Sequence, residues 1–244
     1  MTVLAPIGVI ATVTLRALLG RRRTLLMLLV AGAPVLLGLI IRADRSGSDA
    51  LVPSLEGLTV TSVLPLVSLI FGTAALGSEL DDGTAVHILT KPIPRWSIIG
   101  PKLLVAAGLT AVLLVPSTLL TGILIGGTGS HELGITFAFC IAVLIGSFVY
   151  VAIFVALSAA TSRGLVIGLA YSLLWEGLLA GALPGTQYFS VREYLRGIVS
   201  AMGPHDTLES VVGAQGFLLA VVAFLIVTIL ASTRLARFEI RGAE

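Results

Sequence analysis

The sequence is short of charge. Only 11% of its 244 residues are Asp, Glu, Lys or Arg, whereas 57% are hydrophobic. A soluble domain carries about 25% charged residues. Because so few charges cannot cover the surface of a water-soluble globule, most of the exterior is expected to face lipid.

Residues that carry out chemistry are scarce as well. Cys140 is the single cysteine, so no internal disulfide can form, and the three histidines fall in three separate loops. Metal sites need several ligands at close spacing, so none is predicted. The chain also has no Gly-x-x-x-x-Gly-Lys-Ser/Thr phosphate loop, no Gly-x-Ser-x-Gly elbow and no His-Glu-x-x-His pair. We therefore expect no enzyme, no cofactor and no nucleic-acid partner, and any ATP chemistry must come from another chain.

What the sequence does contain is long apolar runs. A helix needs about 20 apolar residues to cross a bilayer core of ~30 Å. Runs of that length predict six transmembrane helices, over residues 24–41, 58–78, 98–125, 135–160, 164–183 and 214–233. Continuous runs favour helices, because membrane β-strands alternate in hydrophobicity. The predicted fold class is an all-α membrane protein with one transmembrane domain over 1–244 and no room for a soluble catalytic domain.

The basic residues predict the orientation. With six spans both termini share a side, and that side holds eleven of the fifteen Lys and Arg residues. The positive-inside rule places it, with both termini, in the cytoplasm. Residues 1–23 are expected to form an interfacial helix leading into the first span. A seventh span over 3–19 is the alternative, against which Pro6 and Arg16 argue. Thirteen Arg against two Lys suggest a GC-rich genome, hence a bacterial plasma membrane.

One polar segment, ELDDGTAVHILTKPIPR at residues 79–95, lies between the second and third predicted spans. Acids precede a short helix that starts near Gly83, and Lys91 follows its last turn, so both charges suit the helix dipole. Two prolines then stop the helix and stiffen the exit. A plain solvated loop needs neither these prolines nor exposed apolar side chains. Residues 79–97 are therefore predicted to hold a rigid cytoplasmic helix that awaits a partner.

These residues carry a resemblance to type-2 ABC exporter permeases, whose coupling-helix region has the pattern of Glu79, Gly83, Thr84, Lys91-Pro92, Arg95 and Gly100-Pro101-Lys102. The six-span layout, the N-terminal interfacial helix and a long external connection also resemble that family, over nearly the whole chain. The resemblance implies a coupling helix that docks into an ABC ATP-binding subunit. The residues implied to contact that subunit are Glu79, Asp82, Gly83, Thr84, Val86, Ile88, Leu89, Lys91, Pro92 and Arg95.

The resemblance also implies an assembly. Two permease chains, identical or different, would work with two ATP-binding subunits, which bind the ATP and Mg. The chain itself would be the membrane permease of an exporter. An apolar path suits an amphipathic drug, as in multidrug export, or a lipid-like substrate.

The external connection over 184–213 predicts a further helix. Ser190 and Glu193 form a capping box. After it an apolar face repeats at helical spacing, opposite a polar face of Arg192, Glu193 and Arg196. A second helix is expected to start between Asp206 and Glu209. The apolar face consists of Val191, Tyr194, Leu195, Ile198, Val199 and Met202. The connection resembles the external re-entrant helices that close the outer mouth in the family; a plain interfacial connector is the alternative.

Glu176 is the one acidic residue inside a predicted span, which makes a function the default hypothesis. It either lines the transport path or hydrogen-bonds the external helices, with Arg192 or Arg196 as ion-pair partners. Tyr194 is a second candidate for the path or the external gate. Small-residue pairs allow helices to approach closely in lipid. They recur at Gly122 and Gly126, Gly164 and Gly168, and Gly177 and Gly181, and the last two pairs are the candidates for a dimer seam.

Two other classes of function stay open. A secondary transporter is one alternative, but such proteins are built from internal repeats with broken helices, and no repeat is visible in the sequence. An integral membrane enzyme with its site near Glu176 is the other reading, and no cluster of catalytic groups favours it. Co-purification of an ATPase would support the ABC transporter over both.

Overall fold

The computed structural model of the chain describes residues 4–44, 48–81, 96–161, 163–179, 185–204 and 208–241, and every regular element in these ranges is a helix. The all-α prediction is thus confirmed for them. Two elements, η1 and η4, are 3₁₀ turns, and two others, η2 and η3, are π-helical. In chain order the elements are α1 (Leu4–Leu18), α2 (Arg21–Ala43), η1 (Ser48–Ala50), α3 (Leu51–Ser54), η2 (Leu55–Val63), α4 (Leu64–Asp81), α6 (Trp96–Gly126), α7 (Ser130–Ala160), α8 (Gly164–Ala170), η3 (Tyr171–Leu179), η4 (Thr186–Phe189), α10 (Val191–Met202) and α11 (Gln215–Arg241).

Five helices in the described ranges are long and apolar enough to cross a membrane. They match five of the six predicted spans, although the second starts earlier than expected because α3 and η2 precede α4 in one continuous helix. The predicted span over 164–183 is described as a shorter apolar helix, Gly164–Leu178. The count of six therefore stays a prediction. The five helices are Thr24–Ala43, Leu51–Leu76, Ile98–Gly126, Ser130–Ala160 and Gln215–Arg234.

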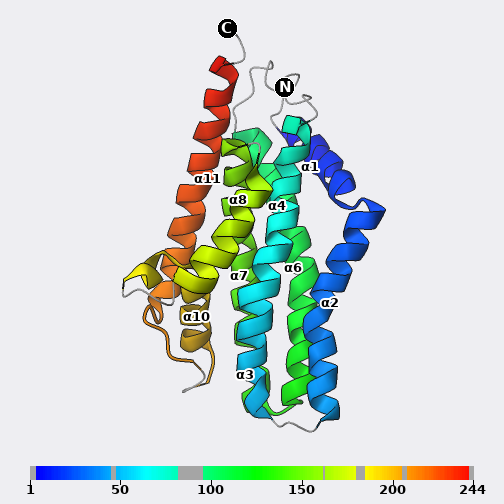
Figure 1. Ribbon diagram of the computed structural model, residues 1–244, viewed down its shortest axis with the longest axis vertical. Coiled ribbons are helices and arrows are strands. Elements are labelled where there is room, and N and C mark those ends of the chain that lie inside the picture. The colour runs from blue at the N-terminus through cyan, green and yellow to red at the C-terminus, as the bar shows by residue number, and fades with distance from the viewer. Residues whose placement is uncertain are drawn as a thin grey trace.

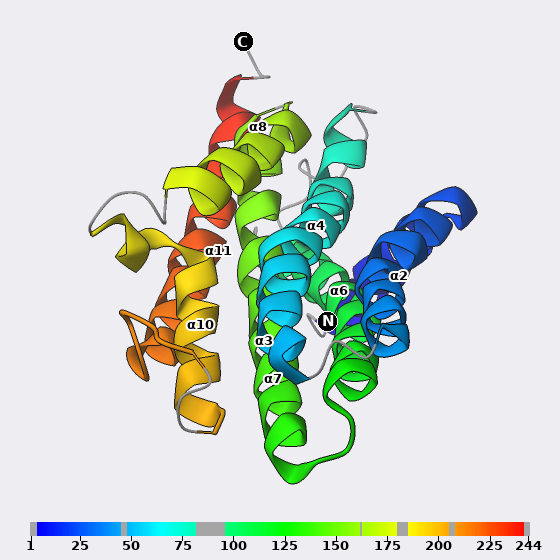
Figure 2. The same ribbon diagram turned by 60° about the horizontal axis from the view of Figure 1, so that its bottom comes forward.

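Helix α7 is the centre of the bundle. It packs against α4, α6, α10 and α11, and Figure 2 shows it between α10 and α11 on one side and α6 and α2 on the other. Three of its aromatic side chains, those of Phe139, Tyr150 and Phe154, are fully buried. The outer helices α2 and α11 instead expose large aliphatic side chains, as helices that face lipid do. Examples are Leu25, Leu29 and Leu36 on α2 and Leu218, Leu225 and Ile229 on α11.

Both ends of the described chain lie at the same end of the bundle (Figure 1). Helix α4 ends and α6 begins at that end, where the Lys102 ammonium donates a hydrogen bond to the Ala75 carbonyl, 3.1 Å away. At the opposite end a tight turn joins α6 to α7, with Gly127 in the left-handed region at a φ of 78°. The polar segment predicted to bind a partner is thus flanked by helix ends on the same side as the termini.

The N-terminal residues form a helix of their own. Gly20 separates α1 from α2, and Figure 1 shows the chain bending sharply between them. Helix α1 packs against α6 and α4. A helix within residues 1–23 is therefore present, while its place at a membrane surface stays a prediction.

Candidate functional site

Two π-helical segments each bring one glutamate to the outer half of the bundle, the half away from the termini. Glu56 lies in η2 and Glu176 in η3. The widened turn of η2 is supported by side chains, since the Thr61 and Ser62 hydroxyls donate to carbonyls five residues earlier, at 2.9 Å and 3.0 Å. Short π-helical segments occur often at functional sites. Both acids point toward α10, the external helix that the sequence predicted.

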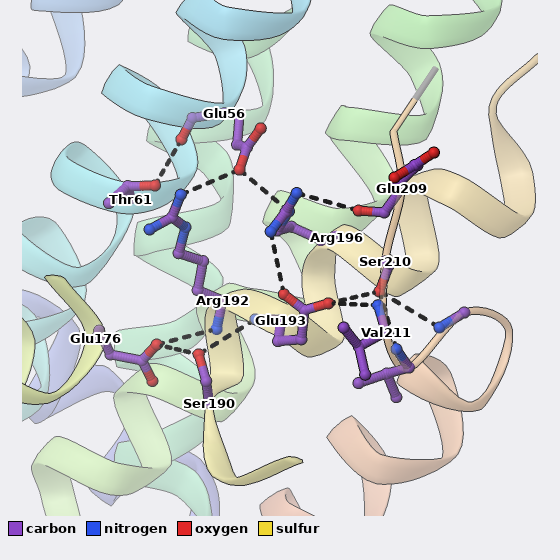
Figure 3. A network of polar contacts seen from close by, with 12 residues as sticks. Glu56, Thr61, Glu176, Ser190, Arg192, Glu193, Arg196, Glu209, Ser210 and Val211 are labelled. Atoms are coloured by element: carbon purple, nitrogen blue, oxygen red, sulfur yellow. Dashed lines mark hydrogen bonds and ion pairs between the residues drawn. The ribbon is translucent and has the colours of Figure 1, made fainter. Parts of the chain in front are cut away.

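Glu176 is 1% exposed, and its carboxylate accepts four hydrogen bonds (Figure 3 shows part of this set). The donors are the Tyr171 hydroxyl at 2.9 Å, the Ser190 hydroxyl at 2.6 Å, and the backbone N–H groups of Val191 at 2.9 Å and Arg192 at 3.2 Å. Unpaired N–H groups at a helix start need acceptors, and a negative charge there suits the dipole. Glu176 therefore caps α10 from a different element.

The predicted hydrogen bonding of Glu176 to the external helix is thus confirmed. The carboxylate contacts the backbone of Arg192 and not its guanidinium. That guanidinium lies 3.1 Å from Glu56, and the guanidinium of Arg196 lies 3.2 Å from the same carboxylate. Both arginine side chains are 29% exposed, and the Glu56 side chain is 16% exposed. The basic face of α10 is therefore tied to η2, while its N-terminus is tied to η3.

Glu193 was predicted to lie on the polar face of α10 with Arg192 and Arg196. It is instead buried, with 6% of its surface exposed. Its N–H donates to the Ser190 hydroxyl, so that half of the predicted capping box is present. Its carboxylate does not reach back to Ser190. It accepts hydrogen bonds from the Ser210 hydroxyl and the Val211 N–H, at 2.8 Å and 2.9 Å, and lies 3.3 Å from Arg196. Glu193 thus fixes the chain that follows α10. We call Glu56, Glu176, Ser190, Arg192, Glu193, Arg196 and Ser210 the outer network.

The apolar face of α10 is largely as predicted. Val191, Leu195, Ile198 and Val199 are at most 3% exposed and Tyr194 is 6% exposed. Met202 is the exception, at 52% exposed, because it lies in the last turn, beyond the packed part of the helix.

A helix was predicted to start between Asp206 and Glu209. This is wrong at Leu208 and Glu209, the part of that range that the structure describes. Residues 208–214 are not helical, and the next helix begins at Gln215. The reason is that Ser210 and Val211 turn toward Glu193, and Gly213 takes a left-handed conformation with a φ of 51°. Residues 205–207 lie outside the described ranges.

Tyr194 belongs to the same structure. Its hydroxyl donates to the Tyr188 carbonyl of η4. Burial, and then the charge of the Glu176 carboxylate, raise the pKa of Tyr194 above its usual value. The phenol therefore keeps its proton and holds η4 against α10.

The residues predicted to contact an ATP-binding subunit are mostly beyond what the structure describes. Glu79 lies in the last turns of α4, which continues to Asp81. Lys102, which belongs to the family pattern but not to the predicted contact residues, lies near the start of α6 and is 1% exposed. The others fall outside the described residues: Asp82, Gly83, Thr84, Val86, Ile88, Leu89, Lys91, Pro92 and Arg95.

The glycines of the predicted dimer seam divide into two groups. A Cβ on Gly164 would lie 2.8 Å from the Ser158 hydroxyl, and one on Gly168 would lie 2.4 Å from Leu69, so both make contacts within the chain. Among the described residues, Gly177 faces no other helix. Gly181 lies outside the described ranges. Of the four, Gly177 is thus the described position that stays available to a second chain.

Among the residues that the structure describes, no three His, Cys, Asp or Glu side chains group as a metal site. The apolar bundle, with five helices in the described ranges long and apolar enough to cross a membrane, defines a multi-pass membrane protein. Residues 20–176 match the family described as "ABC-2 family transporter protein". Because the match covers well over half of the chain, the chain belongs to this family, as its coupling-region pattern predicted. It is a membrane subunit of an ABC transporter, a class that works with an ABC ATP-binding subunit. No curated protein matches the chain.

Proposed function

We propose that this chain is the permease subunit of an ATP-driven exporter that moves a hydrophobic or amphipathic substrate, drug-like or lipid-like, across the bacterial plasma membrane. The family match over residues 20–176 is the observation that carries the proposal. The apolar exteriors of α2 and α11 support multi-pass insertion. The distribution of Lys and Arg supports cytoplasmic termini.

Coupling would run through residues 82–95, seated on an ATP-binding subunit. The flanking helices α4 and α6 pack against each other. At the end nearest this segment, the buried Lys102 bonds the Ala75 carbonyl of α4. Because a buried ammonium needs its partners, this contact resists separation of the two helices. A push on the segment would therefore displace both helices together.

The outer mouth would be closed by α10. This helix lies in the outer half of the bundle, packed on α7 and α11 and contacting η2. The two glutamates of the π-helical segments hold it from two sides. Opening would break the contacts of Glu176 with the N-terminus of α10 and those of Glu56 with Arg192 and Arg196. Because charge-assisted hydrogen bonds are stronger than neutral ones, these contacts would favour the closed state.

The proposal is tested by purifying the chain, tagged and expressed in its own host, and measuring ATP hydrolysis and dye efflux in vesicles. A co-purified ATP-binding subunit is expected. The double variant Gly83→Trp, Thr84→Trp should insert normally and hydrolyse ATP, while efflux falls severalfold because the motion no longer reaches the spans. A chain that transports without any ATPase, or a double variant with normal efflux, would overturn the proposal.

A further inference from the structure

Serine and threonine inside helices commonly donate their hydroxyl to the carbonyl one turn earlier. The buried hydroxyls of this bundle follow that rule in most cases, at oxygen–oxygen distances of 2.7 to 2.9 Å. Such a bond leaves no donor exposed to lipid or to the apolar core. The residues that follow it include Thr14, Thr73, Thr110, Thr118, Thr121, Thr136 and Ser147.

Four buried hydroxyls make neither this bond nor any other within the described residues. Thr59, Ser68 and Tyr150 are 0% exposed and Ser172 is 6% exposed. Their hydroxyl oxygens have no hydrogen-bond partner among the residues that the structure describes. A buried hydroxyl without a partner is costly, and each one needs an explanation. For the serines and the threonine, a bond to their own helix is within easy reach and is not made.

Three of these hydroxyls lie at one level of the bundle. The contacts of Gly168 fix that level, because a Cβ there would meet Leu69 of α4 at 2.4 Å and Phe154 of α7 at 3.0 Å. The three elements therefore touch at this point. Ser68 is the neighbour of Leu69 in α4. Tyr150 of α7 lies one turn from Phe154, and Ser172 of η3 lies one turn from Gly168, both on the side of the outer half.

This level lies just beneath the outer network. Tyr150 is within electrostatic reach of Glu176 and Arg192. One turn closer to the outer end, Leu195 of α10 fills the space beside Gly146, where an added Cβ would lie 2.7 Å from Leu195. Thr59 lies in η2, the segment that also carries Glu56. Helix α10 thus covers the hydroxyl cluster from the outer side.

We propose that Ser68, Tyr150, Ser172 and Thr59 form the polar lining of the substrate path, sealed in this conformation and uncovered when α10 moves. The inference rests on the proposed function and names the chemistry of its substrate. Uncharged hydroxyls both donate and accept hydrogen bonds. They suit a neutral hydroxyl, amide or ester group on an otherwise apolar molecule. Contact with such a group, or with water, satisfies them in the open state.

The single native cysteine makes the test simple. In a Cys140→Ser background, Ser68→Cys and Ser172→Cys each place a thiol of nearly the same size in the cluster. Ser147→Cys is the matched control, because Ser147 is equally buried, also in the bundle core, and its hydroxyl is bonded to the Val143 carbonyl. Each variant is studied in proteoliposomes as the co-purified complex, with N-ethylmaleimide as the probe, with and without ATP and Mg.

We expect the labelling rate of the Ser68→Cys and Ser172→Cys variants to rise severalfold during ATP hydrolysis, with no change for Ser147→Cys. Thr59→Cys replaces either variant that fails to insert, under the same criterion. An unchanged labelling rate at Ser68→Cys and Ser172→Cys, or an equal rise at Ser147→Cys, overturns the inference. If the complex still hydrolyses ATP in that case, the proposed function is unaffected. If no ATP-binding subunit accompanies the chain, the proposed function fails first and the inference with it.

Discussion

At the residue scale, Glu176 caps the N-terminus of α10. Its carboxylate receives four donors, two of them backbone N–H groups at the start of α10. The two oxygens of a carboxylate have enough lone pairs to accept all four of these bonds. The cost of burying this charge is therefore offset by the helix that it holds, and the position of α10 depends on it.

Glu176→Gln is expected to lower the stability of the chain. Glutamine is nearly isosteric but neutral, and its NH₂ group would face N–H and O–H donors. Since hydrogen bonds to charged groups contribute about 1.5–3 kcal/mol each, a loss of about 2 kcal/mol is predicted, seen as a lower melting temperature of the purified chain. The control is Glu209→Gln, because the Glu209 side chain is exposed. Normal stability of Glu176→Gln with an altered substrate preference would instead assign Glu176 to the path.

Sequence alone predicted part of this site. An acid within an apolar run, and a serine three residues before a glutamate, each have a local signature, and both Glu176 and Ser190 were found by it. Glu56 was missed, because it stood at the edge of a predicted span, where an acid needs no partner. The burial of Glu193 was missed because its partners, Ser210 and Val211, belong to a stretch that only the tertiary structure brings near.

At the scale of elements, α10 and α11 cross with their backbones in contact. A Cβ on Gly197 would lie 2.5 Å from the Gly213 carbonyl oxygen, and one on Gly216 would lie 2.4 Å from the Tyr194 carbonyl oxygen. Only residues without a side chain fit at such a crossing. The two glycines thus set how closely the external helix approaches the last membrane helix.

Gly197→Ala is therefore predicted to destabilise the protein, although alanine favours a helix. Overpacking of this kind costs about 1–3 kcal/mol, more than the ~1 kcal/mol that alanine gains over glycine in a helix. Gly108→Ala is the control, since among the described residues nothing lies within 4 Å of a Cβ at this position of α6. Thermal unfolding of both variants decides it: equal melting temperatures would contradict the close crossing.

The π-helical geometry of η2 and η3 could not be predicted from the sequence. Hydrophobic runs predicted spans over 58–78 and 164–183, within which much of the helical chain of 51–81 and 164–179 lies, since apolar length is a property of composition. They gave no sign of η2 and η3, because a widened turn is stabilised by particular contacts. In η2 those are the bonds of Thr61 and Ser62 to carbonyls five residues back. The glycine crossing at Gly197 was likewise invisible without α11 beside it.

At the scale of the whole molecule, one face of η3 is open to a second chain. Leu173, Leu174 and Leu178 are 58%, 56% and 65% exposed, and Gly177 lies among them without a facing helix in the described structure. Close contact at a small residue is the usual way for membrane helices to pair. The prediction of a permease dimer therefore concentrates on this face.

Leu174→Cys in the Cys140→Ser background should form a disulfide-linked dimer on mild oxidation in membranes. Leu218→Cys on α11 is the comparison, being 65% exposed and thus equally open to lipid. Non-reducing electrophoresis reports both. Cross-linking of the Leu218→Cys variant alone would place the dimer interface on α11 instead of η3. Equal cross-linking of both variants would indicate random collision in the membrane.

The central claim is that a separate ATP-binding subunit drives this bundle through residues 82–95. A photo-cross-linking amino acid at Ile88, in membranes of the native host, measures that contact directly, with the same probe at Tyr188 of the outer half as its control. The account predicts an adduct between the Ile88 variant and an ATP-binding subunit, and none from the Tyr188 variant. An ATP-binding subunit captured from Tyr188, or from neither position while the complex hydrolyses ATP, would contradict it.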